Sequence, residues 1–453
     1  MILNERRAIY SLTFIMACRM LGLFIILPIF SLYVTSIQGA TPTLMGFALG
    51  AYGLTQACLQ LPLGYLSDKI GRKKVITAGL VTFALGSLIL ALSHSIYGII
   101  AGRAIQGAGA IGSTLLALAA DLTPEENRSK AMASLGLAIG VSFAIAMILG
   151  PLLNYWVHLT GIFWIIFTLA LLCLLLLHTL IPNPPQEIRG PLFSETETRS
   201  QSSLFNPQLL RLHFGIFSLH AILSATFIAA PILLTQMIKL SEFEQSMLYL
   251  IILCLAFILM LPFILVAEKN RKMKVIFIGA IIMICVCELL LTNYHSSLIF
   301  IGLILLLFFT AFTFLEASLP SLISKIAPIQ RKGTAMGIYS TAQFFGIFIG
   351  SSLGGVIYSH YGVSGLFIFC TVIGLLWLGF AIFMQQPPYL STFIFKLNRS
   401  AIERFELLQQ KILSAPGVAE MAFTSEHDLI FIKADNKIIN KDQLRNVIDE
   451  STL

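Results

Sequence analysis

The sequence predicts an all-α polytopic membrane protein with twelve transmembrane helices in two six-helix halves, followed by a small α+β domain. Composition, the spacing of apolar stretches and the placement of basic residues each support this fold class. Of the 453 residues, 57% are hydrophobic and 11% are charged, and the mean hydropathy is +0.88. A water-soluble globule of this length could not cover so many apolar side chains with polar surface. We therefore expect the lipid bilayer to surround most of the chain.

Apolar stretches of the length that a membrane helix needs recur along residues 8–384. A bilayer core about 30 Å thick is crossed by roughly 20 residues of helix. The first stretch contains Arg19 and lacks a small-residue cleavage pattern, so we expect a retained span rather than a secretory signal. The expected spans are residues 8–34, 43–66, 75–92, 96–119, 131–156, 161–181, 211–236, 243–267, 274–292, 298–324, 333–358 and 363–384.

The basic residues of the loops gather on one side of the expected membrane. Loops that precede odd-numbered spans or follow even-numbered spans carry nearly all loop Lys and Arg, whereas the opposite loops hold Lys239 alone. This distribution follows the positive-inside rule and places both termini in the cytoplasm. It also accounts for the net charge of +7 without a nucleic-acid partner.

The cysteines and other reactive side chains indicate neither a cofactor nor enzyme chemistry. All seven cysteines fall inside expected spans, where they indicate no disulfide framework and no zinc site. The spans contain no metal-ligand cluster and no nucleophile–base spacing, so catalysis is not expected. The expected energy source is a proton gradient.

The chain is expected to have four parts. These are two six-span halves at residues 1–181 and 211–386, a cytoplasmic linker with several prolines at 182–210, and a cytoplasmic domain at 389–453. The halves resemble each other, because Pro62–Lys74 aligns with Pro262–Lys274 and Pro124 aligns with Pro328. Such repeats indicate a duplicated transporter whose substrate site lies near the membrane midplane between the halves.

The soluble domain is expected to have the order β-α-β-β-α. The elements are a strand at Ser391–Leu397, a helix at Ala401–Leu413, a hairpin of Gly417–Thr424 and Asp428–Ala434, and a helix at Lys441–Glu450. This order predicts a ferredoxin-like fold. A domain of this size buries only a small core, so we expect it to dock on the transporter or on a cytoplasmic partner.

Five ionisable residues lie deep enough inside the expected spans to be candidates for a function. An ionisable group near the centre of a membrane helix costs about 2.5–3.5 kcal/mol, so such groups pair with one another or face a wet cavity. Spans 1, 4, 7 and 10 each carry one, which predicts a central path lined by both halves. The candidates for proton coupling and the central cavity are Arg19, Arg103, His220, Glu316 and Glu288.

Glu316 is the first candidate for a proton carrier. An apolar environment favours the neutral form of a carboxyl group and a nearby arginine favours the ionised form, so pairing could switch its protonation. Alternatively, Arg19 and Glu316 form a fixed ion pair between the halves. Glu288 could instead reach the outer membrane interface. His220 could titrate near physiological pH or serve as a hydrogen-bonded packing residue.

The loop between spans 2 and 3 contains a second candidate site. Gly64 permits close helix contact, and Gly71 supports a tight turn. Acidic and basic side chains of the loop can pair with each other and with the cytoplasmic end of span 4. We expect the resulting charge cluster to hold the cytoplasmic helix ends together in one conformation. The residues of this candidate gate are Gly64, Asp68, Gly71, Arg72, Lys73 and Asp121.

Two segments resemble motifs of the major facilitator superfamily. Residues 64–74 (GYLSDKIGRKK) are similar to its signature loop, and residues 103–110 (RAIQGAGA) are similar to its span-4 motif. The arginine of that span-4 motif is associated with proton coupling, which the resemblance carries to Arg103. For the signature loop, the resemblance implies that Asp68, Arg72 and Asp121 form a cytoplasmic latch.

A third segment resembles the span-5 motif of the antiporters in this superfamily. Gly140, Gly150 and Pro151 match the motif, whereas Ala146 and Asn154 stand where it prefers glycine. The resemblance implies the major-facilitator fold, alternating access to a central cavity, and a location in a bacterial inner membrane.

We expect a proton-coupled antiporter that exports small amphipathic or drug-like compounds. A mostly apolar cavity with a few charges suits loosely specified ligands. The alternatives are a proton-linked importer of a small metabolite and a membrane sensor that signals through the C-terminal domain. The expected partners are the lipid bilayer, a small-molecule substrate and protons.

Overall fold

The computed structural model gives the positions of most residues of the chain. It describes residues 3–32, 37–123, 125–182, 206–293, 297–328, 331–386, 390–397, 405–424, 429–435 and 438–449. Most of the expected linker at 182–210 lies outside the described residues. So do Pro124 of the internal repeat, Ala401 at the expected start of a helix, and Asp428 at the expected start of a strand.

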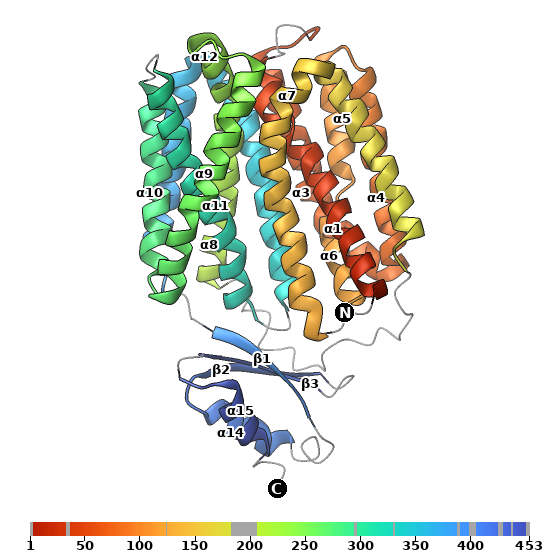
Figure 1. The fold of residues 1–453 in the computed structure, drawn as a ribbon, viewed down its shortest axis with the longest axis vertical. Coiled ribbons are helices and arrows are strands. Elements are labelled where there is room, and N and C mark those ends of the chain that lie inside the picture. Colours follow the sequence, from red (N-terminus) through yellow and green to blue (C-terminus); the bar gives the residue numbers. More distant parts are fainter. Residues whose placement is uncertain are drawn as a thin grey trace.

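Long helices form an upright bundle above a small sheet domain (Figure 1). Runs of Leu, Ile, Phe and Ala favour helix here, because in lipid each segment must satisfy its own backbone N–H and C=O groups. The first half contains α1 (Leu3–Phe24), α2 (Leu27–Phe30), α3 (Pro42–Ile70), α4 (Arg72–Leu92), α5 (Ile96–Ala108), α6 (Gly112–Asp121) and α7 (Glu125–Thr179). The second contains α8 (Pro207–Ile232), the π-helical η4 (Leu233–Met237), α9 (Glu242–Lys269), α10 (Met273–Thr292), α11 (Leu298–Ile326) and α12 (Lys332–Ile382).

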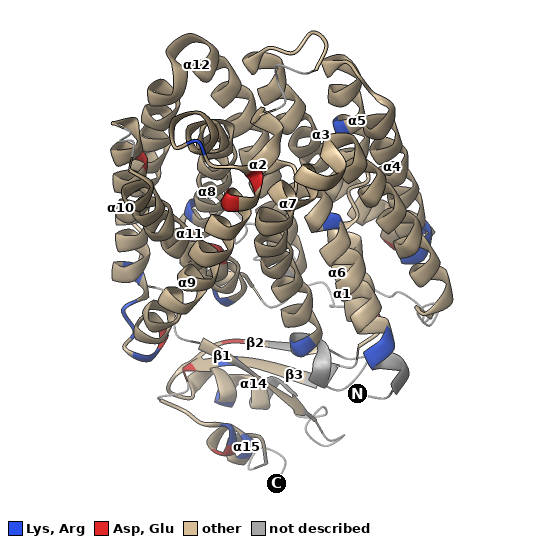
Figure 2. Cartoon of the chain, turned by 45° about the horizontal axis from the view of Figure 1, so that its top comes forward, with Lys and Arg blue, Asp and Glu red and all other residues tan. Residues whose placement is uncertain are grey.

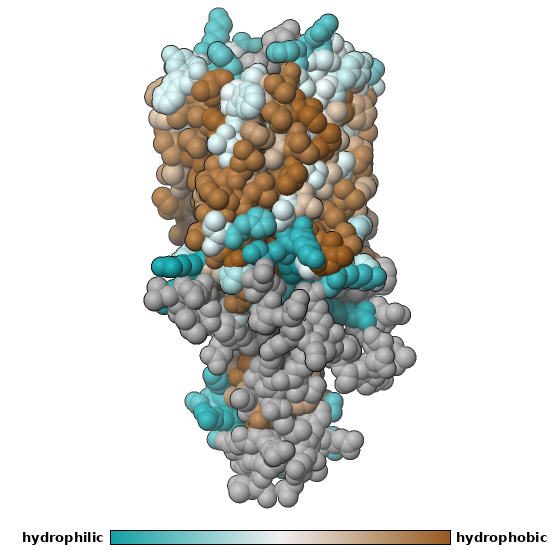
Figure 3. Space-filling model, turned by 90° about the vertical axis from the view of Figure 1, so that its right-hand side faces the viewer, coloured by the Kyte–Doolittle hydropathy of each residue, from teal (hydrophilic) through white to brown (hydrophobic). Residues whose placement is uncertain are grey.

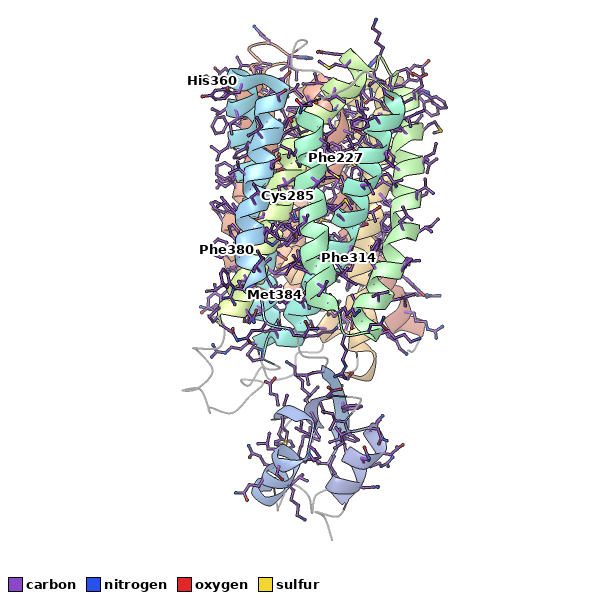
Figure 4. The ribbon with its side chains drawn as sticks, turned by 90° about the vertical axis from the view of Figure 1, so that its left-hand side faces the viewer. Phe227, Cys285, Phe314, His360, Phe380 and Met384 are labelled. Atoms are coloured by element: carbon purple, nitrogen blue, oxygen red, sulfur yellow. The ribbon has the colours of Figure 1, made fainter. Side chains whose placement is uncertain are left out.

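The described helices provide the twelve expected crossings. Nine segments are long and apolar enough to span a membrane. Two of the nine, in α7 and α12, each contain two crossings, because the backbone leaves helical geometry at His158 (φ 57°) and Gly362 (φ 65°). Figure 4 places His360 at one end of the bundle and Met384 near the other. The helix α3, with 29 residues, supplies the remaining crossing.

Both termini lie at the end of the bundle that carries the C-terminal domain (Figure 1). We call this the domain end and the opposite one the far end. Figure 2 shows most Lys and Arg of the bundle near the domain end, and Figure 3 shows an apolar belt between polar rims on the bundle face that it presents. Two termini at the same end require an even number of crossings, which agrees with the twelve expected spans. That the domain end faces the cytoplasm stays a prediction.

Two spans are interrupted inside the bundle. Span 1 breaks between α1 and α2, where Pro28 opens the second piece, and span 4 breaks at residues 109–111 between α5 and α6. Such breaks free backbone N–H groups, and within a membrane they occur only where protein or a cavity surrounds them. The expected continuous spans 8–34 and 96–119 are therefore two helices each.

The C-terminal domain is a three-stranded sheet with two helices. Its elements are β1 (Leu390–Lys396), α14 (Phe405–Ser414), β2 (Val418–Thr424), β3 (Leu429–Asp435) and α15 (Lys441–Asp449), in the predicted order. The strand order is β1-β3-β2, and β3 pairs antiparallel with both neighbours. This arrangement matches the split β-α-β unit of a ferredoxin-like fold. Leu408, Ile412, Ile430, Ile432 and Leu444 lie in its core.

One face of β3 lies against the domain end of the bundle. Side chains alternate along a strand, so Lys433 and Asp435 face away from the core that contains Ile432. Lys433 is 3% exposed, and its Nζ donates to the carbonyl oxygen of Ala327 at 2.5 Å. Arg271 donates to both carboxylate oxygens of Asp435 at 2.5 and 2.9 Å. These contacts join the domain to the second half of the bundle.

Candidate functional site

A carboxyl group and an imidazole face each other in the second half. His220 of α8 is 1% exposed, and its Nε2 lies 3.8 Å from Oε2 of Glu316 on α11. Nε2 of Gln343 on α12 lies 2.8 Å from the same ring nitrogen. With the Gln343 amide in this orientation, its N–H donates and the neutral imidazole accepts. The three residues join spans 7, 10 and 11 in a group that can hold or pass a proton.

Two buried arginines flank Tyr52 in the first half. Arg103 of α5 lies over the Tyr52 ring, with Cζ 4.7 Å from the centroid, and donates to Oε1 of Gln106 at 2.7 Å. Arg19 of α1 donates through Nη2 to Oε1 of Gln56 and to Oη of Tyr52 at 3.5 Å. Each arginine is 1% exposed. The partners of both guanidinium groups among the described residues are uncharged.

Aromatic rings lie between the two polar groups. Tyr52 contacts Phe344, which follows Gln343 in α12, with ring centroids 6.4 Å apart. Phe143 of α7 contacts Phe312 of α11 at 5.3 Å. The arginines therefore lie on one side of the seam between the halves, and the carboxyl–imidazole pair lies on the other.

The alternative of a fixed Arg19–Glu316 ion pair is wrong for this structure. Arg19 turns to Tyr52 and Gln56 of its own half, whereas Glu316 faces His220. No ion pair between Arg19 and Glu316 occurs among the residues that the structure describes. Amide and phenol oxygens on α3 solvate the guanidinium instead.

Glu288 lies apart from the other candidates and does not reach the outer interface. Its side chain is fully buried, and Oγ1 of Thr226 donates to its Oε1 at 2.7 Å. The same hydroxyl lies 3.8 Å from Sγ of Cys370. The Thr226 hydroxyl of α8 therefore holds the carboxyl inside the second half. Figure 4 shows Cys285, three residues before Glu288 in α10, near mid-height of the bundle.

The predicted gate residues form a charge cluster at the domain end. Arg72 forms an ion pair with Asp68, donates through Nε to Oδ2 of Asp121 at 3.1 Å, and donates to Oγ of Ser67 at 2.7 Å. Gly71, with φ 107°, turns the chain between α3 and α4, a conformation that favours glycine. One guanidinium thus joins spans 2, 3 and 4.

Two further residues of the loop connect neighbouring helices. A Cβ on Gly64 would lie 3.1 Å from Oγ of Ser113, so glycine lets α3 approach α6. Nζ of Lys73 donates to the carbonyl oxygen of Ile181 at 2.8 Å, which joins α4 to the end of α7.

The predicted span-5 motif packs against the break in span 1. A Cβ on Gly150 would lie 2.7 Å from the carbonyl oxygen of Ile25, so α7 and the interrupted span are in backbone contact. Pro151 follows inside α7, whereas a Cβ on Gly140 would meet no heavy atom within 4 Å. Asn154, which replaces a motif glycine, donates to Oε1 of Glu242 at 2.6 Å and links the halves at the far end.

Three glycines of α3 lie against the backbone of α12 from the far end to the middle of the bundle. A side chain at Gly46 or Gly53 would collide with a carbonyl oxygen, and one at Gly50 would collide with Oγ of Ser352 at 2.5 Å, so the close contact favours glycine. The distances from an added Cβ to the nearest carbonyl oxygen are 2.3 Å (Gly46 to Ser351), 3.0 Å (Gly50 to Phe348) and 2.6 Å (Gly53 to Phe344). The halves are therefore closed on each other at the far end.

This geometry agrees with the comparison with known families. The sequence profile of the Major Facilitator Superfamily matches residues 12–351 and 313–425. The chain belongs to the Major Facilitator Superfamily. Its described residues contain no group of three or more His, Cys, Asp or Glu placed to hold a metal ion.

Relatives of this Major Facilitator Superfamily transporter are named as transporters. The "Inner membrane transport protein YajR" of Escherichia coli K12 is 41% identical over 448 residues, which cover 99% of this chain and 98% of the relative. An "Uncharacterized transporter" of Buchnera aphidicola subsp. Baizongia pistaciae is 33% identical, with 83% and 95% covered. The crystal structure of a D-xylose-proton symporter matches with a TM-score of 0.66 at 18% identity, covering 84% of this chain and 98% of that one. This last likeness supports the fold alone.

Sequence reasoning missed the neutral polar residues around the charges of this superfamily member. Tyr52, Gln56 and Gln60 recur every fourth position on α3 and share one face. Nε2 of Gln56 donates to Oε1 of Gln60 at 2.8 Å. That spacing in an apolar helix was a usable signal. Gln343 carries no such periodicity, and only the fold brings it to His220.

Proposed function

We propose that this protein is a proton-coupled antiporter that exports small amphipathic compounds by alternating access. The observation that supports this most is the pair at the seam between the halves, with Oε2 of Glu316 3.8 Å from Nε2 of His220. The carboxyl group has a titratable neighbour but no guanidinium partner among the described residues. It can therefore exchange a proton without breaking an ion pair.

Proton exchange at Glu316 would bias the transporter between conformations. Protonation removes a charge from the seam, and deprotonation restores it. A charge in a dry protein environment is costly, so the ionised form favours a conformation in which water reaches the seam. A difference in free energy of this kind is what shifts a two-state equilibrium.

Two contact regions support alternating access. The far end is closed by the glycines of α3 against α12 and by the hydrogen bond from Asn154 to Glu242. The domain-end cluster of Asp68, Arg72 and Asp121 joins spans 2, 3 and 4 of the first half at the opposite end, and we propose that it holds these helix ends in one conformation as a second latch. In this proposal the two regions loosen in turn.

The domain end is proposed to face the cytoplasm of a bacterial cell. The basic residues near that end support this orientation (Figure 2), because cytoplasmic loops carry an excess of Lys and Arg. The C-terminal domain would then be cytoplasmic. Its contacts with Ala327 and Arg271 favour a role that is exerted on the transporter itself.

The sign of proton movement tests the proposal. The full-length protein is reconstituted in liposomes with trapped pyranine and a clamped membrane potential. Naphthalene-2-sulfonate or (naphthalen-2-ylmethyl)trimethylammonium is added outside; both carry permanent charges and do not cross unaided. Antiport predicts that the lumen becomes alkaline as at least one probe enters. Acidification would contradict antiport and favour the importer, and an unchanged pH with both probes would contradict export of amphipathic compounds.

A further inference from the structure

We infer that the break in span 4 forms the binding site for an oxyanion group of the substrate, held by Arg19 and the N-terminus of α6. This inference rests on the proposed function, because it names the substrate class. The class is amphipathic anions, in which a carboxylate or sulfonate is joined to an apolar body.

The N-terminus of α6 provides the first half of the site. The helix runs over Gly112–Asp121 and begins inside the bundle, and no side chain caps its start at Ile111. The first N–H groups of a helix lack backbone partners and carry the positive end of the helix dipole, which together favour anions. Oγ1 of Thr114, in the first turn, is also buried without a hydrogen-bond partner among the described residues.

The guanidinium of Arg19 provides the second half. Its Nε and Nη1 are buried and have no hydrogen-bond partner among the residues that the structure describes. Nη1 lies 3.6 Å from the place that a Cβ on Gly112 would occupy, and Nε2 of Gln60 lies 3.2 Å from it. An unpartnered guanidinium nitrogen and the Gln60 amide therefore lie beside the glycine that opens the helix. The fork of a guanidinium matches the two oxygens of a carboxylate or sulfonate.

The charge balance of the bundle favours an anion at this place. Arg103, on the other side of Tyr52, also has an unpartnered nitrogen, Nε, in the described structure. Two buried cations without a carboxylate partner are costly in a low dielectric, and an anionic ligand offsets that cost. The second half instead places carboxyl groups inside the bundle, on the partly exposed Glu316 and the fully buried Glu288, and these offer an anion no positive charge.

The apolar body of the ligand would lie against the aromatic side chains of the seam. Phe24 follows Arg19 on the same span and contacts Phe143 with ring centroids 5.2 Å apart. Phe143 in turn contacts Phe309 and Phe312 of the second half at 6.2 and 5.3 Å. An anionic head at Arg19 and an aromatic tail across the seam would bridge both halves, as a transported substrate must.

Binding to the purified full-length protein in detergent tests the site without any proton gradient. The shift in Tm is titrated with naphthalene-2-sulfonate, with 2-naphthalenemethanol and with (naphthalen-2-ylmethyl)trimethylammonium, which share one apolar body. We expect the sulfonate to bind at least about tenfold more tightly than the alcohol or the cation, since charge-assisted hydrogen bonds are lost in both. Equal shifts with all three, or a shift with the cation alone, would overturn the inference.

Two variants locate the binding. Arg19→Gln removes the charge, and Gly112→Ala places a methyl group between the helix start and the guanidinium without changing the charge. Each should weaken sulfonate binding about tenfold or more. Arg7→Gln, at an exposed position of the same helix, is the matched control and should bind as the parent does. Unchanged binding in Gly112→Ala would place the anion elsewhere, even if Arg19→Gln fails to fold.

Failure of the site and failure of the proposed function give different results. If the sulfonate binds through Arg19 but moves no protons in liposomes, the site stands and proton-coupled export falls. If the cation is exported with proton exchange and the sulfonate does not bind, export stands and the oxyanion site falls.

Discussion

Glu316 shows how far single residues could be interpreted from the sequence. The free-energy cost of a carboxyl group in an apolar helix was enough to identify Glu316 as a candidate. Its neighbours were not identified, because His220 and Gln343 are distant in the chain and meet only in the fold. The same limit applies to Arg19. Its expected carboxylate partner lies in the other half, whereas uncharged oxygens of Tyr52 and Gln56 lie closer.

Asp68→Asn should loosen the domain-end cluster. The substitution removes one of the two carboxylates that contact Arg72 and leaves Asp121. Partly exposed ion pairs contribute only about 0.2–1 kcal/mol, so we expect a shift of at most about fivefold in the balance of conformations. The measurement is the rate at which an impermeant thiol reagent labels a cysteine introduced at the domain end of α3. Unchanged labelling together with unchanged transport would show that Asp68 does not hold the domain-end cluster together.

At the scale of helices, apolar periods located the spans but not their interruptions. The bounds of α4, α9 and α10 lie close to the expected ones. The breaks in spans 1 and 4 were missed, because a few residues of turn inside an apolar run hardly change its hydropathy. Pro28 and the glycines before α6 were local signals of these breaks. These signals alone do not establish a break, because a break inside a membrane also needs neighbouring helices that surround the freed backbone groups.

Gly46→Val should hold the far end of the bundle open. An added Cβ would lie 2.3 Å from the carbonyl oxygen of Ser351, so α3 and α12 could not close. We expect transport to fall more than tenfold. A cysteine introduced at position 344 should also be labelled faster by an impermeant thiol reagent applied from the far end. Gly279→Val, where a Cβ meets nothing within 4 Å, is the matched control. Normal transport by Gly46→Val would show that far-end closure does not require this contact.

At the scale of the whole molecule, charge placement predicted the common side of the two termini. The sequence also predicted the order of the C-terminal elements. It did not predict which face of the domain meets the bundle. Alternation marks two faces of β3, but the contacts of Lys433 with Ala327 and of Asp435 with Arg271 depend on the orientation of the domain as a body.

Deletion of the chain after Pro388 separates a transporter from a sensor. The domain contacts the ends of the second half, and the seam residues lie inside the bundle, so a transporter should retain at least about half of its flux. The measurement is probe flux in liposomes for the truncated and full-length proteins at equal reconstituted amounts. Complete loss of flux by a folded, truncated protein would contradict independence of the bundle and favour signalling through the domain.

Proton coupling at the seam can be tested by comparing two carboxyl groups of the second half. Glu316 faces His220 at the seam between the halves, whereas Glu288 is enclosed within the second half beside Thr226. Proton-driven movement of the naphthyl probes is measured in liposomes for Glu316→Gln and for Glu288→Gln. We expect Glu316→Gln to lose proton coupling and Glu288→Gln to keep it. Coupling that survives Glu316→Gln would show that this carboxyl group does not carry the proton.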